Sequence, residues 1–408
     1  MAIIRPFRAL RPRPELAASI AAVPYDVVNR DEAAALAAGN PLSFLHVSRA
    51  EIDLPPDTNP YADAVYEKAV ANFAALRSSM VEEAAPSVYF YRLRMGTHAQ
   101  TGLAACYSVD EYNRDIIKKH EKTRKDKEDD RTRHIIDLRA QTGPVFLTYR
   151  HDATVDAIVA RVCAGAPLYD LVAPDGITHT VWRADEEATR ALVQAFGALP
   201  ALYIADGHHR AASAARAHDR FGGGQASSGP DAEHAWFLAV AFPDNQTQIL
   251  PYNRAVKDLA GKTPEQFLAG VRERFTVEPG GATPAGKGAC QMYLGGQWHT
   301  VVLHPAGAPA SADPITSLDV SLLQDGLLAP LLGVLDPRTD KRIDFVGGIR
   351  GTGELERLVS SGSAAVAFSM HPVTVAELMA IADAGAIMPP KSTWFEPKLR
   401  DGLVSHVI

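Results

Sequence analysis

Apolar runs rich in strand-forming residues alternate with segments of helical periodicity along the whole chain. Strands are predicted at 87–95, 101–109, 142–149 and 235–242, and helices at 61–76, 152–163 and 185–196. Later segments repeat this mixture up to a helix at 373–384. Because several of the strands look antiparallel, the pattern favours an α+β fold over a doubly wound parallel sheet.

Two segments have a less regular pattern. Residues 40–49 form an apolar run with polar groups at its end, which predicts a buried strand. Residues 110–134 interleave charges of both signs, which is typical of a solvated helix with ion pairs between residues four apart.

The most informative stretch is 201–214, where an apolar run ends in Asp206-Gly-His-His-Arg210 and an alanine-rich helical pattern follows at once. The change of period predicts a strand, a tight turn and the N-terminus of a helix. Free backbone N–H groups and the positive end of the helix dipole favour anions there. Gly207 allows a sharp turn or the close approach of a ligand.

Three interpretations of this turn remain open from the residue types. In the first, Arg210 and the helix N-terminus hold a phosphate, His208 or His209 donates to it, and Asp206 is a general base or a magnesium ligand. In the second, Asp206 and the two histidines bind a transition metal, although adjacent histidines diverge at a helix start. In the third, Asp206 caps the helix and the histidines only pack.

Other catalytic motifs are missing from the sequence. It contains neither GxSxG nor GxxxxGK[ST], and no cysteine stands beside a predicted base, so neither a nucleophilic serine or cysteine nor a P-loop is indicated.

Two distant segments are also dense in functional groups. The first, within the charged run, comprises His120, Glu121, Lys122, Thr123 and Arg124. The second is the tail, 388–398, which adds Lys391, Ser392, Thr393 and Lys398 beside closely spaced aromatic residues. Those aromatics predict that the tail docks on the body of the protein and brings its lysines towards a site.

Composition narrows the class of protein. A length of 408 residues favours two or three domains. The net charge of -7 provides no basic excess for binding nucleic acid or a membrane surface. Three widely spaced cysteines fit a reducing cytoplasm, and we expect neither a signal peptide nor a membrane span.

Several motifs in the same order resemble the bacterial and archaeal family called domain of unknown function 1015. They lie at residues 4–10, 24–28, 40–47, 120–123, 203–210 and 388–398. The Asp206–Arg210 segment also resembles the phosphate-binding motif of the ParB/sulfiredoxin superfamily, which includes free L-serine kinases. Sulfiredoxin has a reactive cysteine before its His-Arg pair, where this chain has Gly207-His208, so that activity is not indicated.

The resemblance implies a ParB/sulfiredoxin-like mixed sheet core with helices over residues 1–255, with an inserted strand–helix segment at about 86–150. A further α+β region at 256–408 would follow, and its tail would return to the site. The three motif segments, at 120–124, 206–210 and 388–398, should then meet in one cleft.

The resemblance and the residues together suggest a cytoplasmic phosphotransferase that acts on a small hydroxyl compound, with free L-serine as the best single acceptor. ATP, ADP or pyrophosphate would be the donor, and Asp206 or Glu121 would hold Mg²⁺ and take the hydroxyl proton. Asp26 and Arg49 would bind the charged ends of the amino acid. A homodimer is compatible with the sequence. The alternatives are a nucleotide-binding regulatory protein without turnover and a metal-dependent hydrolase.

Overall fold

The computed structural model describes residues 2–222, 232–304 and 313–408. The chain divides into two compact units, of which the first comprises Met1–Thr247 with Pro397–Ile408 and the second comprises Gln248–Glu396. Both units mix helices with sheets, so the α+β class expected from the sequence is confirmed. The end of the chain belongs to the first unit, beside the strands formed by its beginning.

The first unit is built on a mixed sheet with the order β6-β11-β8-β12-β5-β4-β10-β9. β11 is parallel to β6 and antiparallel to β8, and β12 is parallel to β8, whereas the other neighbours are antiparallel. The bounds are β4 Tyr89–Met95, β5 His98–Ser108, β6 Ile117–Lys118, β8 Val145–Tyr149, β9 Tyr169–Val172, β10 Thr178–Arg183, β11 Leu202–Asp206 and β12 Trp236–Pro243. β1 (Ile4–Arg5) pairs with β5. The predicted strands at 87–95, 101–109, 142–149 and 235–242 are thereby confirmed.

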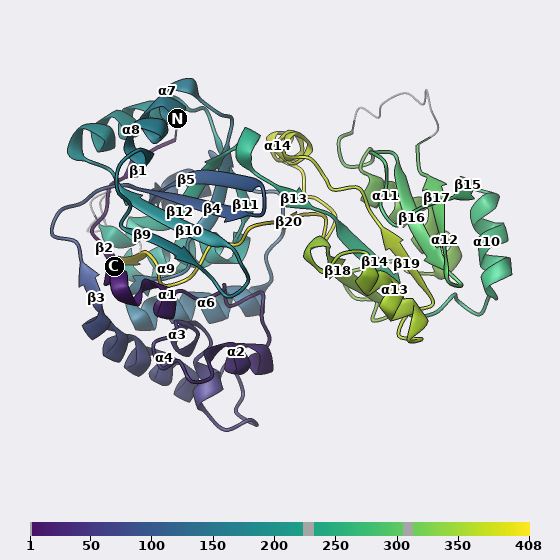
Figure 1. The fold of residues 1–408 in the computed structure, drawn as a ribbon, viewed down its shortest axis with the longest axis horizontal. Helices are drawn as coiled ribbons and strands as arrows, with labels where there is room; N and C mark the ends of the chain where they lie inside the picture. The colour runs from purple at the N-terminus through teal and green to yellow at the C-terminus, as the bar shows by residue number, and fades with distance from the viewer. Residues whose placement is uncertain (1, 223–231, 305–312) are drawn as a thin grey trace. The chain divides into compact units, whose positions relative to one another are not determined.

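One hydrophobic core joins this sheet to the helices of the first unit. α7 (Ala153–Cys163), α8 (Glu186–Ala198) and α9 (His208–Gly222) contribute Val155, Phe196 and Ala211, and the strands contribute residues such as Leu147 and Ile204. Alternate residues of β8 and β11 enter this core because side chains on a strand point to opposite faces in turn. α6 (Lys125–Leu138) packs along α9 (Figure 1).

A small sheet fixes the end of the chain. β21 (Ser405–Val407) pairs with β2 (Ala9–Pro12) and with β7 (Ala140–Gln141), and β2 also pairs with β3 (Met80–Glu82). Just before β21, the buried guanidinium of Arg400 donates to His179 Nε2 at 3.1 Å and pairs with Asp175. The residues between Pro397 and β21 are therefore held on the first unit.

A helical layer built from residues 30–79 has a core of its own. It contains α2 (Arg30–Ala37), α3 (Leu45–Ser48), a 3₁₀ turn at Ala50–Asp53 and α4 (Asp63–Leu76). The strand predicted at 40–49 is wrong, because Leu45–Ser48 is a short helix. A short apolar run does not separate a buried strand from a buried helix, and here the Asn40 side chain accepts the backbone N–H of Leu42 and turns the chain.

The charged run at 110–134 is not one helix. β6 follows α5 (Val109–Asn113), and α6 begins only at Lys125. The residues from Lys119 to Arg124 between them have neither helical nor strand structure. The segment that carries His120 and Glu121 therefore belongs to neither a helix nor a sheet.

The second unit has a six-stranded sheet with the order β15-β17-β16-β19-β14-β18. The bounds are β14 Tyr252–Val256, β15 Thr276–Pro279, β16 Ala289–Leu294, β17 Gln297–Val302, β18 Ile343–Gly347 and β19 Val366–Ser369. The unit's helices are α10 Pro264–Arg272, α11 Asp319–Leu323, α12 Ala329–Leu332, α13 Gly353–Ser360 and α14 Val375–Asp383. A separate strand pair joins β13 (Ile249–Leu250) to β20 (Trp394–Phe395).

In the part of the chain that the structure describes, no helix has both the length and the hydrophobicity needed to cross a bilayer.

Candidate functional site

The strand–turn–helix predicted at 201–214 is present. β11 ends at Asp206 and α9 begins at His208, so Gly207 alone makes the turn. Its φ of +91° lies in the region that residues with a side chain rarely adopt. The backbone N–H of Gly207 donates to Asp206 Oδ1 at 2.9 Å, which holds the carboxylate at the N-terminus of α9.

Asp206 lies among positive charges. Lys398 Nζ donates to Asp206 Oδ2 at 2.9 Å, and Arg210 lies 3.8 Å from the same oxygen. Burial by itself would raise the pKa of Asp206, but the charges of Lys398 and Arg210 outweigh it and lower that pKa well below its usual range. Asp206 is therefore an ionised carboxylate at neutral pH.

Arg210 reaches from the first turn of α9 across the site. Its guanidinium donates to the Pro144 carbonyl and lies 3.8 Å from Asp26 as well as from Asp206. Burial would lower the pKa of Arg210, but the surrounding carboxylates raise it above its usual range. Among the described residues, the buried Nε of Arg210 has no hydrogen-bond acceptor. A buried charged donor without an acceptor is unusual and marks the place where a ligand atom could bind.

His208 is buried and contacts the 120–121 segment on two sides. Its Nε2 accepts the backbone N–H of His120 at 3.5 Å, and its ring meets the His120 ring edge to face at 4.4 Å. Burial lowers the pKa of His208, so the ring is neutral and its proton sits on Nδ1. That Nδ1 lies 3.8 Å from Glu121 Oε2, so His208 directs an N–H towards this carboxylate.

His120 itself is almost fully buried. Burial lowers its pKa to about 4, so its ring is neutral at pH 7. In the described part of the chain, neither of its ring nitrogens has a hydrogen-bond partner.

His209, the next residue of α9, makes a similar contact. Its Nε2 accepts the backbone N–H of Arg124 at 3.0 Å, and burial lowers its pKa. The Arg124 guanidinium pairs with Asp126 at 2.9 Å, and the Thr123 hydroxyl donates to Glu128, while Lys122 is exposed. Both histidines of the motif thus accept N–H groups from the irregular 119–124 segment and hold it against α9.

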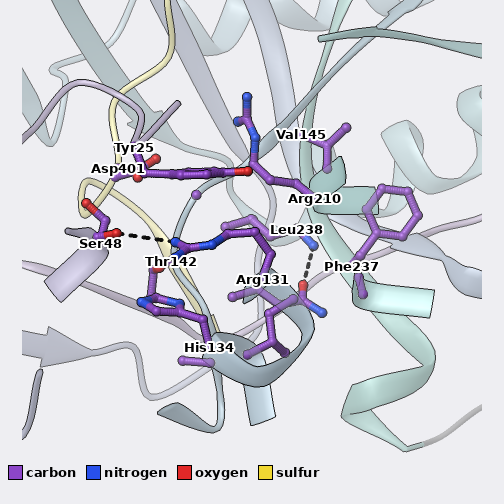
Figure 2. Close-up of a pocket in the computed structure, with 15 residues that line it drawn as sticks. Tyr25, Ser48, Arg131, His134, Thr142, Val145, Arg210, Phe237, Leu238 and Asp401 are labelled. Carbon is purple, nitrogen blue, oxygen red and sulfur yellow. Dashed lines mark hydrogen bonds between the residues drawn. The ribbon is translucent and has the colours of Figure 1, made fainter. Parts of the chain in front are cut away.

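A small cavity of about 40 Å³ lies beside Arg210 (Figure 2). Figure 2 shows the Tyr25 ring between the side chains of Arg131 and Arg210, and the Arg131 guanidinium lies 4.2 Å from the centre of that ring. Asp401, from the last residues of the chain, also lines the cavity. Burial raises the pKa of Asp401 to about 7, even though Arg210 and Arg131 lower it in part.

The raised pKa of Asp401 predicts a pH effect on stability. The native state binds a proton here that the unfolded chain releases at about pH 4, so this group costs the native state free energy as the pH rises from about 4 through about 7. We expect Asp401→Asn to remove the cost. In urea unfolding, the free energy of unfolding of the variant minus that of the unaltered chain should be about 4 kcal/mol larger at pH 8 than at pH 4. An equal difference at both pH values would contradict the assignment.

Gly207→Ala should damage the site through the backbone. A Cβ at this position would lie 3.0 Å from Cζ and Nε of Arg210, and φ of +91° strains any residue with a side chain. We expect a loss of about 1–3 kcal/mol in the free energy of unfolding and a displaced Arg210. Gly39→Ala is the matched control, because Gly39 also has positive φ but a Cβ there would meet no atom within 4 Å. Equal losses in both variants would show that contact with Arg210 contributes nothing.

The structure shows the following contacts for the remaining residues expected from sequence. Arg49 lies beside Glu51, with Nε 3.1 Å from its carboxylate, and lines a second pocket rather than the Arg210 cavity. Lys391, Ser392 and Thr393 belong to the second unit. There the Lys391 carbonyl accepts from the buried Arg254 at 3.3 Å, and Ser392 Oγ donates to the Pro389 carbonyl at 2.8 Å.

Sequence reasoning missed three residues of the site, namely Tyr25, Arg131 and Asp401. Tyr25 stands directly before Asp26, a predicted site residue, and its aromatic ring between Pro24 and Asp26 is the signal that could have identified it. Arg131 lies in the charged run for which the sequence predicts a solvated helix, whereas the structure stacks its guanidinium on Tyr25. Asp401 follows the motif at 388–398 by three residues and carries no local signal of burial.

No group of three or more His, Cys, Asp or Glu side chains within residues 2–222, 232–304 and 313–408 is placed to hold a metal ion.

The fold and the site define a mixed α+β protein whose charged strand–turn–helix is surrounded by histidines and carboxylates. The chain belongs to the family described as "Protein of unknown function (DUF1015)", whose model matches residues 4–321. No curated protein matches it.

Solved structures that resemble the chain share little sequence with it. A free serine kinase in complex with AMP is 12% identical with a TM-score of 0.36, over 74% of this chain and 91% of that chain. A conserved hypothetical protein from Pyrococcus furiosus is 14% identical with a TM-score of 0.36, over 74% and 94%. SbnI with a C-terminal truncation, from Staphylococcus aureus, is 13% identical with a TM-score of 0.37, over 74% and 86%. At these TM-scores, the similarities support no statement about activity.

Proposed function

We propose that this protein is a phosphotransferase that phosphorylates a small hydroxyl metabolite, with free L-serine as the first acceptor to test and ATP, ADP or pyrophosphate as donor. The observation that carries the proposal is the arrangement at the start of α9. An ionised Asp206, the cations Arg210 and Lys398, and a second carboxylate, Glu121, stand around a helix N-terminus. Phosphoryl transfer depends on such positioning and charge neutralisation more than on covalent chemistry by the protein.

The two carboxylates suit different tasks. The low pKa of Asp206 makes it a weak proton acceptor, so its role is electrostatic. Glu121 is half exposed, and its Oε2 lies 3.8 Å from Nδ1 of the neutral His208 ring. Glu121 would take the proton of the acceptor hydroxyl while the hydroxyl oxygen forms a bond to the terminal phosphorus of the donor. The remainder of the donor would leave with the electrons of the broken P–O bond.

Donor binding would use the N-terminus of α9. Its free N–H groups and dipole favour a phosphate, and Arg210 adds a fixed positive charge. Asp206 supplies oxygen ligands of the kind that Mg²⁺ uses together with substrate phosphates, so this residue would hold the ion, which neutralises phosphate charge when bound.

A direct assay tests the proposal. The purified chain is incubated with L-serine, Mg²⁺ and, in turn, ATP, ADP and pyrophosphate, and O-phosphoserine is measured by mass spectrometry. Homoserine, threonine and glycerate extend the acceptor panel. The absence of a phosphorylated product with every donor and acceptor would reject the proposal, as would full activity in Arg210→Ala.

A nucleotide-binding protein without turnover is the second candidate. It is favoured by one observation, that His208 and His209 both use Nε2 to hold backbone N–H groups, as a structural device would. It predicts thermal stabilisation by nucleotide, worth about 2.7 kcal/mol at a hundredfold excess over the dissociation constant, with no product from any acceptor.

A further inference from the structure

The first unit contains a second and larger pocket, of about 320 Å³. Its walls come from the helical layer at residues 30–69 and from α6. Ser48, Arg131 and His134 line both this pocket and the small cavity beside Arg210. The larger pocket therefore adjoins the cavity beside Arg210, and these three side chains border both.

Positive charge predominates in the lining. Four cationic side chains face two carboxylates, those of Glu51 and Asp130, and the four cations are Arg30, Arg49, Lys127 and Arg131. His134 adds no charge, because burial lowers its pKa to about 3. The pocket thus has an excess of two positive charges, which favours an anionic occupant.

The four cations differ in how many of their donors already form hydrogen bonds or ion pairs. Arg30 donates to backbone carbonyls of the 51–56 loop, and Arg131 pairs with Asp130 at 2.9 Å. Lys127 donates to the Tyr61 hydroxyl at 3.2 Å and, in the described part of the chain, has no carboxylate partner. These contacts leave Arg49 as the guanidinium with the most free donors.

Two adjacent lining residues carry buried polar atoms that have no hydrogen-bond partner among the residues the structure describes. Arg49 Nε lies 3.1 Å from Glu51 Oε1, but the geometry makes no hydrogen bond. The hydroxyl of Ser48, a residue only 3% exposed, also has no hydrogen-bond partner among the described residues. Leaving a buried donor unsatisfied costs about 1–3 kcal/mol, so two such groups side by side in a pocket wall call for a ligand that satisfies both.

The neutral ring of His134 adds a hydrogen-bond acceptor to the donors of Arg49 and Ser48. Its Nε2 lies 3.1 Å from the Val47 carbonyl and must donate to it, which leaves Nδ1 as an acceptor. The pocket therefore offers donors for an anion and one acceptor for an N–H or O–H group. A small hydroxy acid or amino acid carries this combination.

We propose that this pocket binds the acceptor by its carboxylate, with Arg49 and Ser48 as the donors, so that the substrates are hydroxy acids with a free carboxylate. The inference rests on the proposed phosphotransferase function. Arg49 and Ser48 are binding residues, and the chemistry remains at Glu121 and Asp206.

Binding without turnover tests this proposal separately from the reaction. L-serine, homoserine and glycerate are titrated into the full chain by calorimetry with no donor present, and L-serinamide is titrated as the analogue without a carboxylate. We expect at least one of the three acids to bind. Serinamide should bind about tenfold to hundredfold more weakly than serine, and a variant without Arg49 should bind the acid more weakly by a similar factor, the range that a charge-assisted hydrogen bond supports. No binding by any acid, or equal binding of serine and serinamide, would overturn it.

The variants are chosen to keep the fold intact. Arg49→Gln leaves the buried Glu51 carboxylate unpaired, so Arg49→Gln/Glu51→Gln, which removes both charges, is the main variant and Ser48→Ala the second. Arg190→Gln is the control, because Arg190 forms an exposed ion pair with Glu186 outside the pocket. Unchanged acid binding in both pocket variants would refute the proposal that this pocket binds the carboxylate of the acceptor. If the acids bind through Arg49 but no phosphorylated product forms, the proposed phosphotransferase function is rejected and the binding pocket is retained.

Discussion

The Glu121→Gln variant is expected to lose phosphoryl transfer by about 10²–10⁴-fold, the usual contribution of a positioned general base. Glutamine keeps the shape of the side chain and can still face the Nδ1–H of His208, 3.8 Å from Glu121 Oε2 in the structure. Only the capacity to take the hydroxyl proton disappears. The loss should therefore appear in kcat, with little change in KM for the donor.

The control for this variant is Glu67→Gln, which neutralises an exposed carboxylate on α4. Nucleotide binding, followed by thermal shift, should be equal in Glu121→Gln, Glu67→Gln and the unaltered chain. If Glu121→Gln retains full kcat, Glu121 takes no proton, and the assignment of roles to the two carboxylates is wrong.

The role given to Glu121 depends on a segment whose structure the sequence did not predict. Alternating charges at 110–134 satisfy the helical pattern well, and a helix was the reasonable prediction. The chain is irregular from Lys119 to Arg124 because His208 and His209 accept the backbone N–H groups of His120 and Arg124. Such long-range contacts override local propensity, and no local pattern reports them.

The central turn was predictable for the opposite reason. At 201–214 the hydrophobic period changes abruptly at a glycine, so strand, turn and helix are each specified by local residues. The chemistry of its side chains was only partly predictable. The structure places the Arg210 guanidinium near Asp26, Asp206 and the Pro144 carbonyl, and of these three neighbours only Asp206 is close in sequence.

Burial of charge was the other property that the sequence did not reveal. Arg131 and Asp401 belong to residue types that usually lie on the surface. The Arg131 side chain is only 13% exposed and Asp401 is buried, because segments far apart in the chain meet there. By contrast, the sequence predicted that the tail brings Lys398 towards the site. Lys398 contacts Asp206, 192 residues away in sequence.

That contact leads to the second large effect, which is expected for Asp206→Asn. The substitution leaves Lys398, whose side chain is 13% exposed, without its carboxylate at 2.9 Å, and weakens the surroundings of Arg210. Breaking a fully buried pair costs about 3–5 kcal/mol, and because Asp206 is partly exposed we expect about 1–3 kcal/mol in the free energy of unfolding. Donor binding and transfer should be lost together, since Asp206 acts through its charge.

The sign of the pH dependence follows from the lowered pKa of Asp206. A carboxyl whose native pKa lies below its unfolded value stabilises the protein above the unfolded pKa, so this stability is present at pH 7 and declines as the pH falls below about 4. Urea unfolding should therefore show a difference between Asp206→Asn and the unaltered chain that is full at pH 7 and narrows in acid. A difference that is constant down to pH 3 would show that Asp206 is not held ionised by its neighbours.

Stability and activity can be separated with a double variant. Asp206→Asn/Lys398→Met removes both charges of the pair, so no unpaired ammonium remains near α9, and we expect most of the lost stability to return. Activity should stay absent, because the carboxylate that faces the donor is still missing. If activity returned together with stability, Asp206 would serve only to hold the C-terminal segment through Lys398, and the phosphate site would have to be assigned to Arg210 and Glu121 without it.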